Sequence, residues 1–141
     1  GIELKSSKRI TQQFGSNVHI NVTSYNRLVL LTGEAPTAEI KADIEKLIMG
    51  VDNVRKIYNE IAVANATSLA SRSNDTLLTS KVKTRFLTER KFQINHVKIV
   101  SENAVVYLMG MVTRQEGDNA AQIASGTSGV RKVVKVFEYI N

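Results

Sequence analysis

"HVKIVSENAVVYLMG", residues 96–110, repeats the pattern of "HINVTSYNRLVLLTG", residues 19–33, which lies 77 positions earlier. In both stretches apolar and polar residues alternate on either side of a polar turn, which indicates a β-hairpin. Each hairpin is expected to end at a glycine, Gly33 or Gly110. The chain therefore contains one supersecondary unit twice, and this internal repeat sets its domain organisation.

A helix is expected after each hairpin. In the first copy Thr37 is the predicted N-cap, and Gly50 ends the helix. In the second copy Thr113 and Glu116 form a T-x-x-E capping box, and Gly126 ends the helix. Both copies thus carry a start signal and a stop signal at matching places.

A third strand is expected to follow that helix. The segment "NVRKIYNEI" (53–61) aligns with "GVRKVVKVF" (129–137), and the strand is predicted to begin at Val54 or Val130. A leading helix is expected before each hairpin, near residues 2–13 in the first copy and from Asp75 to Arg90 in the second, with Asp75 as its N-cap.

The fold class predicted from this order is α+β. Each copy is helix-strand-strand-helix-strand, with two helices covering one face of a three-stranded mixed sheet. The expected domains are residues 1–64 and 75–141, and the segment 65–74, rich in Ala, Ser and Asn, is expected to link them.

The composition is that of an ordinary globular protein, with 141 residues, 43% hydrophobic and 23% charged. The absence of cysteine excludes disulfides and thiolate chemistry. Residues 1–66 hold 8 basic and 7 acidic side chains, net +1, whereas residues 67–141 hold 11 basic and 6 acidic ones, net +5. A positive field of this kind favours binding to polyanions such as nucleic acid or an anionic membrane. The excess positive charge lies in the second copy.

Neither catalytic residues nor a metal site emerges from the sequence. His19 and His96 stand at equivalent places but lack the further ligands that a zinc site needs. "SGTSG" (125–129) lies before a strand, unlike a nucleophile elbow, and its "GTSG" is not between two helices, unlike a KH loop. We therefore expect no enzyme activity, no cofactor, no small-molecule substrate and no nucleic-acid partner.

The helix predicted over residues 75–90 has apolar residues outside its core face. At ~100° per residue, Leu78, Val82 and Phe86 share one face, whereas Leu77 and Leu87 fall elsewhere. Around these two leucines lie hydroxyl residues and cations: Ser80, Lys81, Lys83, Thr84, Arg85, Thr88 and Lys91. Leucines that enter the acyl boundary beside ammonium groups that meet anionic headgroups form an interfacial membrane site.

Two other readings of these leucines stay open on sequence grounds. Single exposed leucines are common on soluble proteins. Leu77 could also act as a hydrophobic staple near the helix start, and Leu87 could pack against the other copy.

The repeated hairpin, the helix and the "GV-x-x-V" entry to the last strand resemble the BON domain, in tandem over essentially the whole chain. Closer still are "INVTSYNRLVLLTGEAPTAE", "MGVDNVRKIYNEI", "SNDTLLTSKVKTRFLT" and "VVYLMGMVT". Together these stretches resemble the dual-BON outer-membrane lipoproteins of Gram-negative bacteria.

The resemblance implies a periplasm-facing protein that supports envelope integrity and is tethered to the outer membrane by an N-terminal lipidated cysteine. That cysteine and a tether are expected to precede Gly1. In that family the second domain binds anionic phospholipid, chiefly phosphatidylglycerol, and the first domain does not. Carried over by position, the lipid-binding residues are Leu77, Lys81, Val82, Lys83, Thr84, Arg85, Leu87 and Thr88. Better-known members carry tryptophan where this chain has Leu77.

The leading hypothesis is a non-enzymatic peripheral membrane protein whose partner is an anionic phospholipid membrane, with envelope proteins as further partners. A soluble periplasmic BON protein that acts as a holdase or adaptor through protein contacts is the alternative. Nucleic-acid binding is a third hypothesis, which predicts salt-dependent retention on RNA or DNA.

Overall fold

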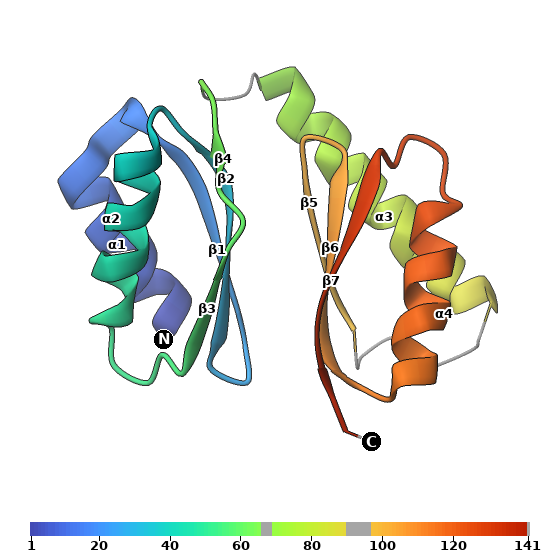
Figure 1. Ribbon diagram of the computed structural model, residues 1–141. Coiled ribbons are helices and arrows are strands. Elements are labelled where there is room, and N and C mark those ends of the chain that lie inside the picture. Colours follow the sequence, from blue (N-terminus) through green and yellow to red (C-terminus); the bar gives the residue numbers. More distant parts are fainter. Residues whose placement is uncertain (66–68, 90–96, 141) are drawn as a thin grey trace. The chain divides into compact units, whose positions relative to one another are not determined.

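The computed structural model describes residues 1–65, 69–89 and 97–140. The chain divides into two compact units, Gly1–Ser68 and Leu69–Asn141. In each unit two helices lie on one face of a mixed sheet (Figure 1). The predicted α+β fold class is therefore confirmed.

The first unit has its elements in the predicted order. They are α1 (Ile2–Phe14), a 3-10 turn (Gly15–Asn17), β1 (His19–Tyr25), β2 (Leu28–Ala35), α2 (Ala38–Met49), β3 (Lys56–Asn59) and β4 (Ala62–Val63). β2 pairs with β1 antiparallel and with both β3 and β4 parallel, so the third strand is in two pieces. The Asn59 side chain accepts a hydrogen bond from the Ile61 amide at 3.2 Å and donates one to the Lys41 carbonyl at 3.0 Å. These bonds accompany the break between β3 and β4.

The second unit repeats this order with an unbroken third strand. Its elements are α3 (Leu69–Glu89), β5 (Lys98–Glu102), β6 (Val105–Val112), α4 (Arg114–Ser125) and β7 (Lys132–Tyr139). β6 is the central strand, antiparallel to β5 and parallel to β7 along the whole of β7. α3 and α4 cover one face of this sheet (Figure 1).

Both hairpins turn through two residues with positive φ. Asn26 and Arg27 have φ of 50° and 61°, and Asn103 and Ala104 have φ of 50° and 63°. This is the two-residue type I′ geometry, whose twist matches that of the flanking strands. Further along β2, Gly33 has φ of 113°, and a Cβ there would collide with the His19 carbonyl oxygen on β1. Glycine is therefore required for the close approach of these strands.

The predicted helix signals are confirmed. The Thr37 hydroxyl accepts from the Ile40 amide at 3.1 Å. Thr113 and Glu116 form the reciprocal capping box, with bonds of 3.1 Å and 2.8 Å. The C-caps are Gly50 and Gly126, with closely similar φ and ψ of −80° and −4° against −81° and −2°.

The third strands begin at Lys56 and Lys132, two residues later than the predicted starts in both units. The preceding residues, Arg55 and Arg131, already donate backbone hydrogen bonds to Arg27 and Ala104. The disagreement is therefore one of strand boundary and leaves the pairing unchanged.

The predicted core face of the second leading helix is confirmed. Leu78, Val82 and Phe86 are buried and pack with residues of β6, β7 and α4, namely Val106, Leu108, Val112, Phe137, Ala120, Ile123 and Ala124. In the first unit Ile10 of α1 occupies a similar place beside the core formed by Val29, Leu31, Ala35, Ile44, Ile48 and Ile61.

The predicted start of this leading helix is wrong. α3 begins at Leu69, so residues 69–74 of the expected linker are helical, and Asp75 lies within the helix. Instead of capping a helix, the buried Asp75 carboxylate accepts the amides of Asn103 and Ala104 at 2.6 Å and 2.8 Å, which fixes α3 to the β5–β6 turn. Linker residues 66–68, and likewise Arg90, Lys91 and His96, lie outside the described residues.

Candidate functional site

The outward side of α3 is the candidate site. Leu77 is 64% exposed and Leu87 is 57% exposed, and both Lys81 and Lys83 are exposed. The predicted exposure of the two leucines is thus confirmed, and neither side chain is committed to a core. Ten residues of helix separate them by about 15 Å along its axis, so a flat surface lying along α3 reaches both.

One residue from the predicted lipid-binding set lies elsewhere. Val82 is fully buried in the core between α3 and the sheet. Its side chain cannot reach a ligand on the outward side of α3 in this structure. Val82 therefore packs α3 against the core and is not part of the candidate site.

A row of hydroxyl groups follows the outward side of α3 at four-residue spacing. Thr76, Ser80, Thr84 and Thr88 each donate a hydrogen bond to the backbone carbonyl four residues earlier, at 3.2, 3.2, 2.9 and 3.0 Å. Because the hydroxyl protons point at the helix backbone, the oxygen lone pairs remain for outside donors.

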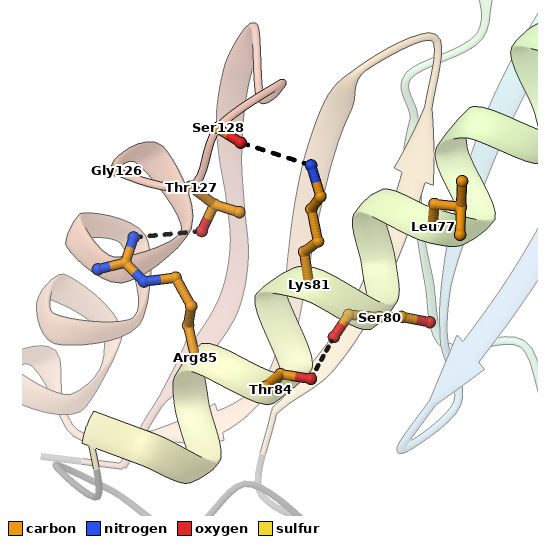
Figure 2. Close-up of a pocket in the computed structure, with 8 residues that line it drawn as sticks. All are labelled: Leu77, Ser80, Lys81, Thr84, Arg85, Gly126, Thr127 and Ser128. Carbon is orange, nitrogen blue, oxygen red and sulfur yellow. Dashed lines mark hydrogen bonds between the residues drawn. The ribbon is translucent and has the colours of Figure 1, made fainter.

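A groove of about 560 Å³ runs between α3 and the loop that joins α4 to β7. Its lining residues are Leu77, Ser80, Lys81, Thr84, Arg85, Gly126, Thr127 and Ser128. The Lys81 ammonium crosses the groove and donates to the Ser128 hydroxyl at 3.4 Å (Figure 2). The groove thus combines one apolar side chain, two cations and several hydroxyls.

Arg85 has a structural role within this groove. Its Nη1 donates to the Ile123 carbonyl in the last turn of α4 at 2.9 Å and to the Thr127 hydroxyl at 3.4 Å. Its Nη2 lies 3.6 Å from a carboxylate oxygen of Glu89. A guanidinium at a helix C-terminus satisfies carbonyl groups that have no partner within the helix. Arg85 therefore joins α3 to the end of α4.

The contribution of the α4–β7 loop was missed by sequence reasoning, although the repeat carries a signal for it. Lys81 and Arg85 are four residues apart on α3, and Lys5 and Arg9 have the same spacing on α1. In both units the arginine Nη1 lies close to a C-cap glycine. A Cβ added to Gly50 would lie 3.5 Å from Nη1 of Arg9, and a Cβ added to Gly126 would lie 3.1 Å from Nη1 of Arg85.

The structure brings half of the eight predicted lipid-binding residues together in the groove. Leu77, Lys81, Thr84 and Arg85 line the groove, whereas Lys83, Leu87 and Thr88 are exposed along α3 outside it. Among the residues that the structure describes, no three His, Cys, Asp or Glu side chains gather where they could hold a metal ion. None of the helices within residues 1–65, 69–89 and 97–140 is both long and apolar enough to cross a bilayer.

The sequence matches the BON domain family over residues 5–65 and 74–141. The chain belongs to the BON-domain family. Both matched segments coincide with the two helix-strand-strand-helix-strand units, so each unit is a BON domain, and the tandem arrangement expected from the resemblance is confirmed. The α3 groove lies in the second BON domain.

Relatives of the whole tandem support this assignment. Outer membrane lipoprotein DolP of Haemophilus influenzae is 40% identical over 129 residues, covering 92% of this chain and 67% of that protein. The 21 kDa hemolysin of Actinobacillus pleuropneumoniae is 34% identical, covering 91% of this chain and 66% of its own length. Osmotically-inducible protein Y of Escherichia coli is 29% identical, covering 81% of this chain and 58% of its own length. The chain thus spans about two thirds of the first two relatives.

Proposed function

We propose that the second BON domain binds anionic phospholipid, of which phosphatidylglycerol is the expected type, through the outward side of α3. The observation that carries this proposal is the exposure of Leu77 and Leu87, 64% and 57%, on a helix that also presents Lys81 and Lys83. Leucine side chains enter the acyl boundary of a bilayer, and each cation near an anionic surface adds about 1 kcal/mol.

The magnitude of this attraction indicates reversible binding. Full burial of a leucine side chain contributes about 1.5–3 kcal/mol, and an interfacial leucine is only partly buried. Two leucines and two exposed lysines therefore give weak attachment, and stable attachment takes a second anchor. The similarity to an outer membrane lipoprotein supports an N-terminal lipid chain as that anchor.

In the full-length protein this chain would be a non-enzymatic, periplasm-facing part of an outer-membrane lipoprotein that supports envelope integrity. The 40% identity to DolP over 92% of the chain supports this location. Fractionation of cells that express the full-length protein tests it. Recovery in the soluble periplasmic fraction would favour instead a BON protein that acts through protein contacts.

Vesicle co-sedimentation tests the lipid site. Wild-type protein is expected to sediment with phosphatidylcholine vesicles that contain phosphatidylglycerol and to remain in solution with pure phosphatidylcholine. Replacing both leucines, Leu77→Asp with Leu87→Asp, removes the apolar contacts and adds repulsion, so affinity should fall about a hundredfold or more. Added salt should weaken the binding of the wild type, because salt screens the lysines.

A matched control variant lies in the first domain. Leu4→Asp with Met49→Asp makes the same change in charge at side chains that are 69% and 53% exposed. Its binding should equal that of the wild type. The proposed site is wrong if the two double variants bind equally, or if the wild type binds equally to vesicles with and without phosphatidylglycerol.

A further inference from the structure

The loop after the second helix has the same backbone geometry in both BON domains. In the first domain the Val51 amide donates to Ile48 at 3.0 Å and the Val54 amide donates to Val51 at 3.3 Å. In the second domain Thr127 donates to Ala124 at 3.1 Å and Val130 donates to Thr127 at 3.2 Å. Each loop therefore starts at a C-cap glycine and places its residues at equivalent positions.

Equivalent positions in the two loops carry different charges. Asn53 and Gly129 both adopt positive φ, 74° and 93°, which aligns the loops without a gap. One residue earlier, the first domain has Asp52 and the second has Ser128. On the leading helix, by the same alignment, Lys5 corresponds to Lys81. Both domains thus have a lysine at this position of the leading helix. The loop residue that this lysine contacts in the second domain is Ser128, and the equivalent residue in the first domain is Asp52.

Ser128 leaves the Lys81 ammonium available to an anion. The ammonium donates to the Ser128 hydroxyl at 3.4 Å, and the hydroxyl has its own proton to donate outward. An aspartate at this place would bring a negative charge close to the ammonium and repel an incoming anion. Ser128 is exposed and lines the groove with Lys81, so both groups can reach one phosphate (Figure 2).

We infer that the phosphate of an anionic phospholipid sits in the α3–loop groove between Lys81 and Ser128, and that serine rather than aspartate at this position makes the second domain the lipid-binding one. The inference rests on the proposed function and adds its specificity determinant. The ligand carries negative charge, which complements the net +5 of residues 67–141 against the net +1 of residues 1–66. Arg85 is a positioning residue here, because its bonds to Ile123 and Thr127 hold the loop against α3.

The test is to give the second domain the aspartate of the first. Ser128→Asp should fold, since aspartate occupies the same loop position in the first domain. It neutralises Lys81 and adds a repulsive charge, so its affinity for vesicles with phosphatidylglycerol should fall roughly tenfold to thirtyfold. Ser128→Asn has nearly the same size as the aspartate without its charge, and it should lose far less. Thermal unfolding of each variant establishes that the domain is intact.

A control for net charge lies at the other end of α4. Gln115→Asp adds the same charge to an exposed position in the first turn of this helix, away from the groove. It should bind within about threefold of the wild type, because exposed charges beyond a Debye length are largely screened. Wild-type affinity in Ser128→Asp, or equal losses in the aspartate and asparagine variants, would overturn the inference.

Two further comparisons distinguish an error in the groove assignment from an error in the proposed function. If Leu77→Asp with Leu87→Asp abolishes binding while Ser128→Asp binds with wild-type affinity, the groove is wrong and the proposed function stands. If neither changes binding, both are wrong. Titration with inorganic phosphate, followed by the amide signals of residues 126–128, should give no saturation at concentrations where vesicles saturate; saturation there would overturn the assignment to a lipid phosphate.

Discussion

The Arg85 guanidinium donates a 2.9 Å hydrogen bond to the Ile123 carbonyl oxygen, and so fastens the leading helix of the second BON domain to the C-terminal turn of α4. In the first domain the Arg9 guanidinium approaches Gly50, at the same end of α2. An arginine aimed at a helix C-terminus is therefore a feature of the repeated fold as well as of the site. Arg85 and Lys81, although both cationic, should respond differently to substitution.

Arg85→Gln should lower the free energy of unfolding of the second domain by about 1–2 kcal/mol, because charge-assisted hydrogen bonds to the end of α4 are lost. Urea denaturation followed by hydrogen exchange of α4 amides measures this. Lys83→Gln makes the same charge change at an exposed position of α3 and should leave stability within about 0.5 kcal/mol. Equal stability of the two variants would refute the structural role of Arg85.

Asp75→Ala should destabilise the second domain by about 2–4 kcal/mol. The substitution leaves the amides of Asn103 and Ala104 without their acceptor at a part-buried turn, and each unsatisfied donor costs about 1–3 kcal/mol. Asp75→Asn keeps one carbonyl oxygen and should fall between the wild type and the alanine variant. A cost for Asp75→Ala below about 0.5 kcal/mol, measured by chemical denaturation, would mean that water replaces the carboxylate.

Gly33→Ala should be among the most damaging single substitutions in the first domain. The added Cβ meets the His19 carbonyl at a residue with φ of 113°, so the β1–β2 ladder must separate and several kcal/mol are lost. Gly15→Ala is the control, because Gly15 has φ of 59° but open space around its Cβ position. Its cost should be about 1–2 kcal/mol. Thermal unfolding of the two variants should therefore differ clearly, and equal midpoints would contradict the steric argument.

The fold was predictable because its signals are local. Capping by Thr37 and Thr113, the glycines that end α2 and α4, and the alternation in the hairpins depend on residues a few positions apart. Asp75 was wrongly predicted to be an N-cap because the prediction used local signals alone. A carboxylate before an apolar stripe usually caps a helix, but here Asp75 accepts hydrogen bonds from the amides of Asn103 and Ala104 in the β5–β6 turn, 28 and 29 positions away.

The site was predictable only on one of its two sides. Periodicity places Leu77 and Leu87 off the core face of α3, and their exposure follows from that geometry. The loop side depends on tertiary contact, since Lys81 and Ser128 are 47 positions apart. Periodicity placed Val82 correctly on the core face of α3, and only the position carried over from the family included it among the lipid-binding residues.

Leu77→Trp should strengthen membrane binding about threefold to tenfold, because tryptophan prefers the headgroup interface. The side chain at this position is 64% exposed, so the larger ring fits without disturbing the core. The chain contains no other tryptophan, which makes the new indole a specific fluorescent reporter. Its emission should shift to shorter wavelength when vesicles with phosphatidylglycerol are added, as the ring leaves water.

Leu4→Trp supplies the comparison, because Leu4 is 69% exposed on the leading helix of the first domain. Its emission should not change with the same vesicles if α3 alone enters the interface. Co-sedimentation of both variants gives the affinities from which the gain at Leu77 is calculated. Equal spectral shifts at the two positions would mean that the protein approaches the bilayer through both domains, and an unshifted Leu77→Trp would place the outward side of α3 away from the membrane.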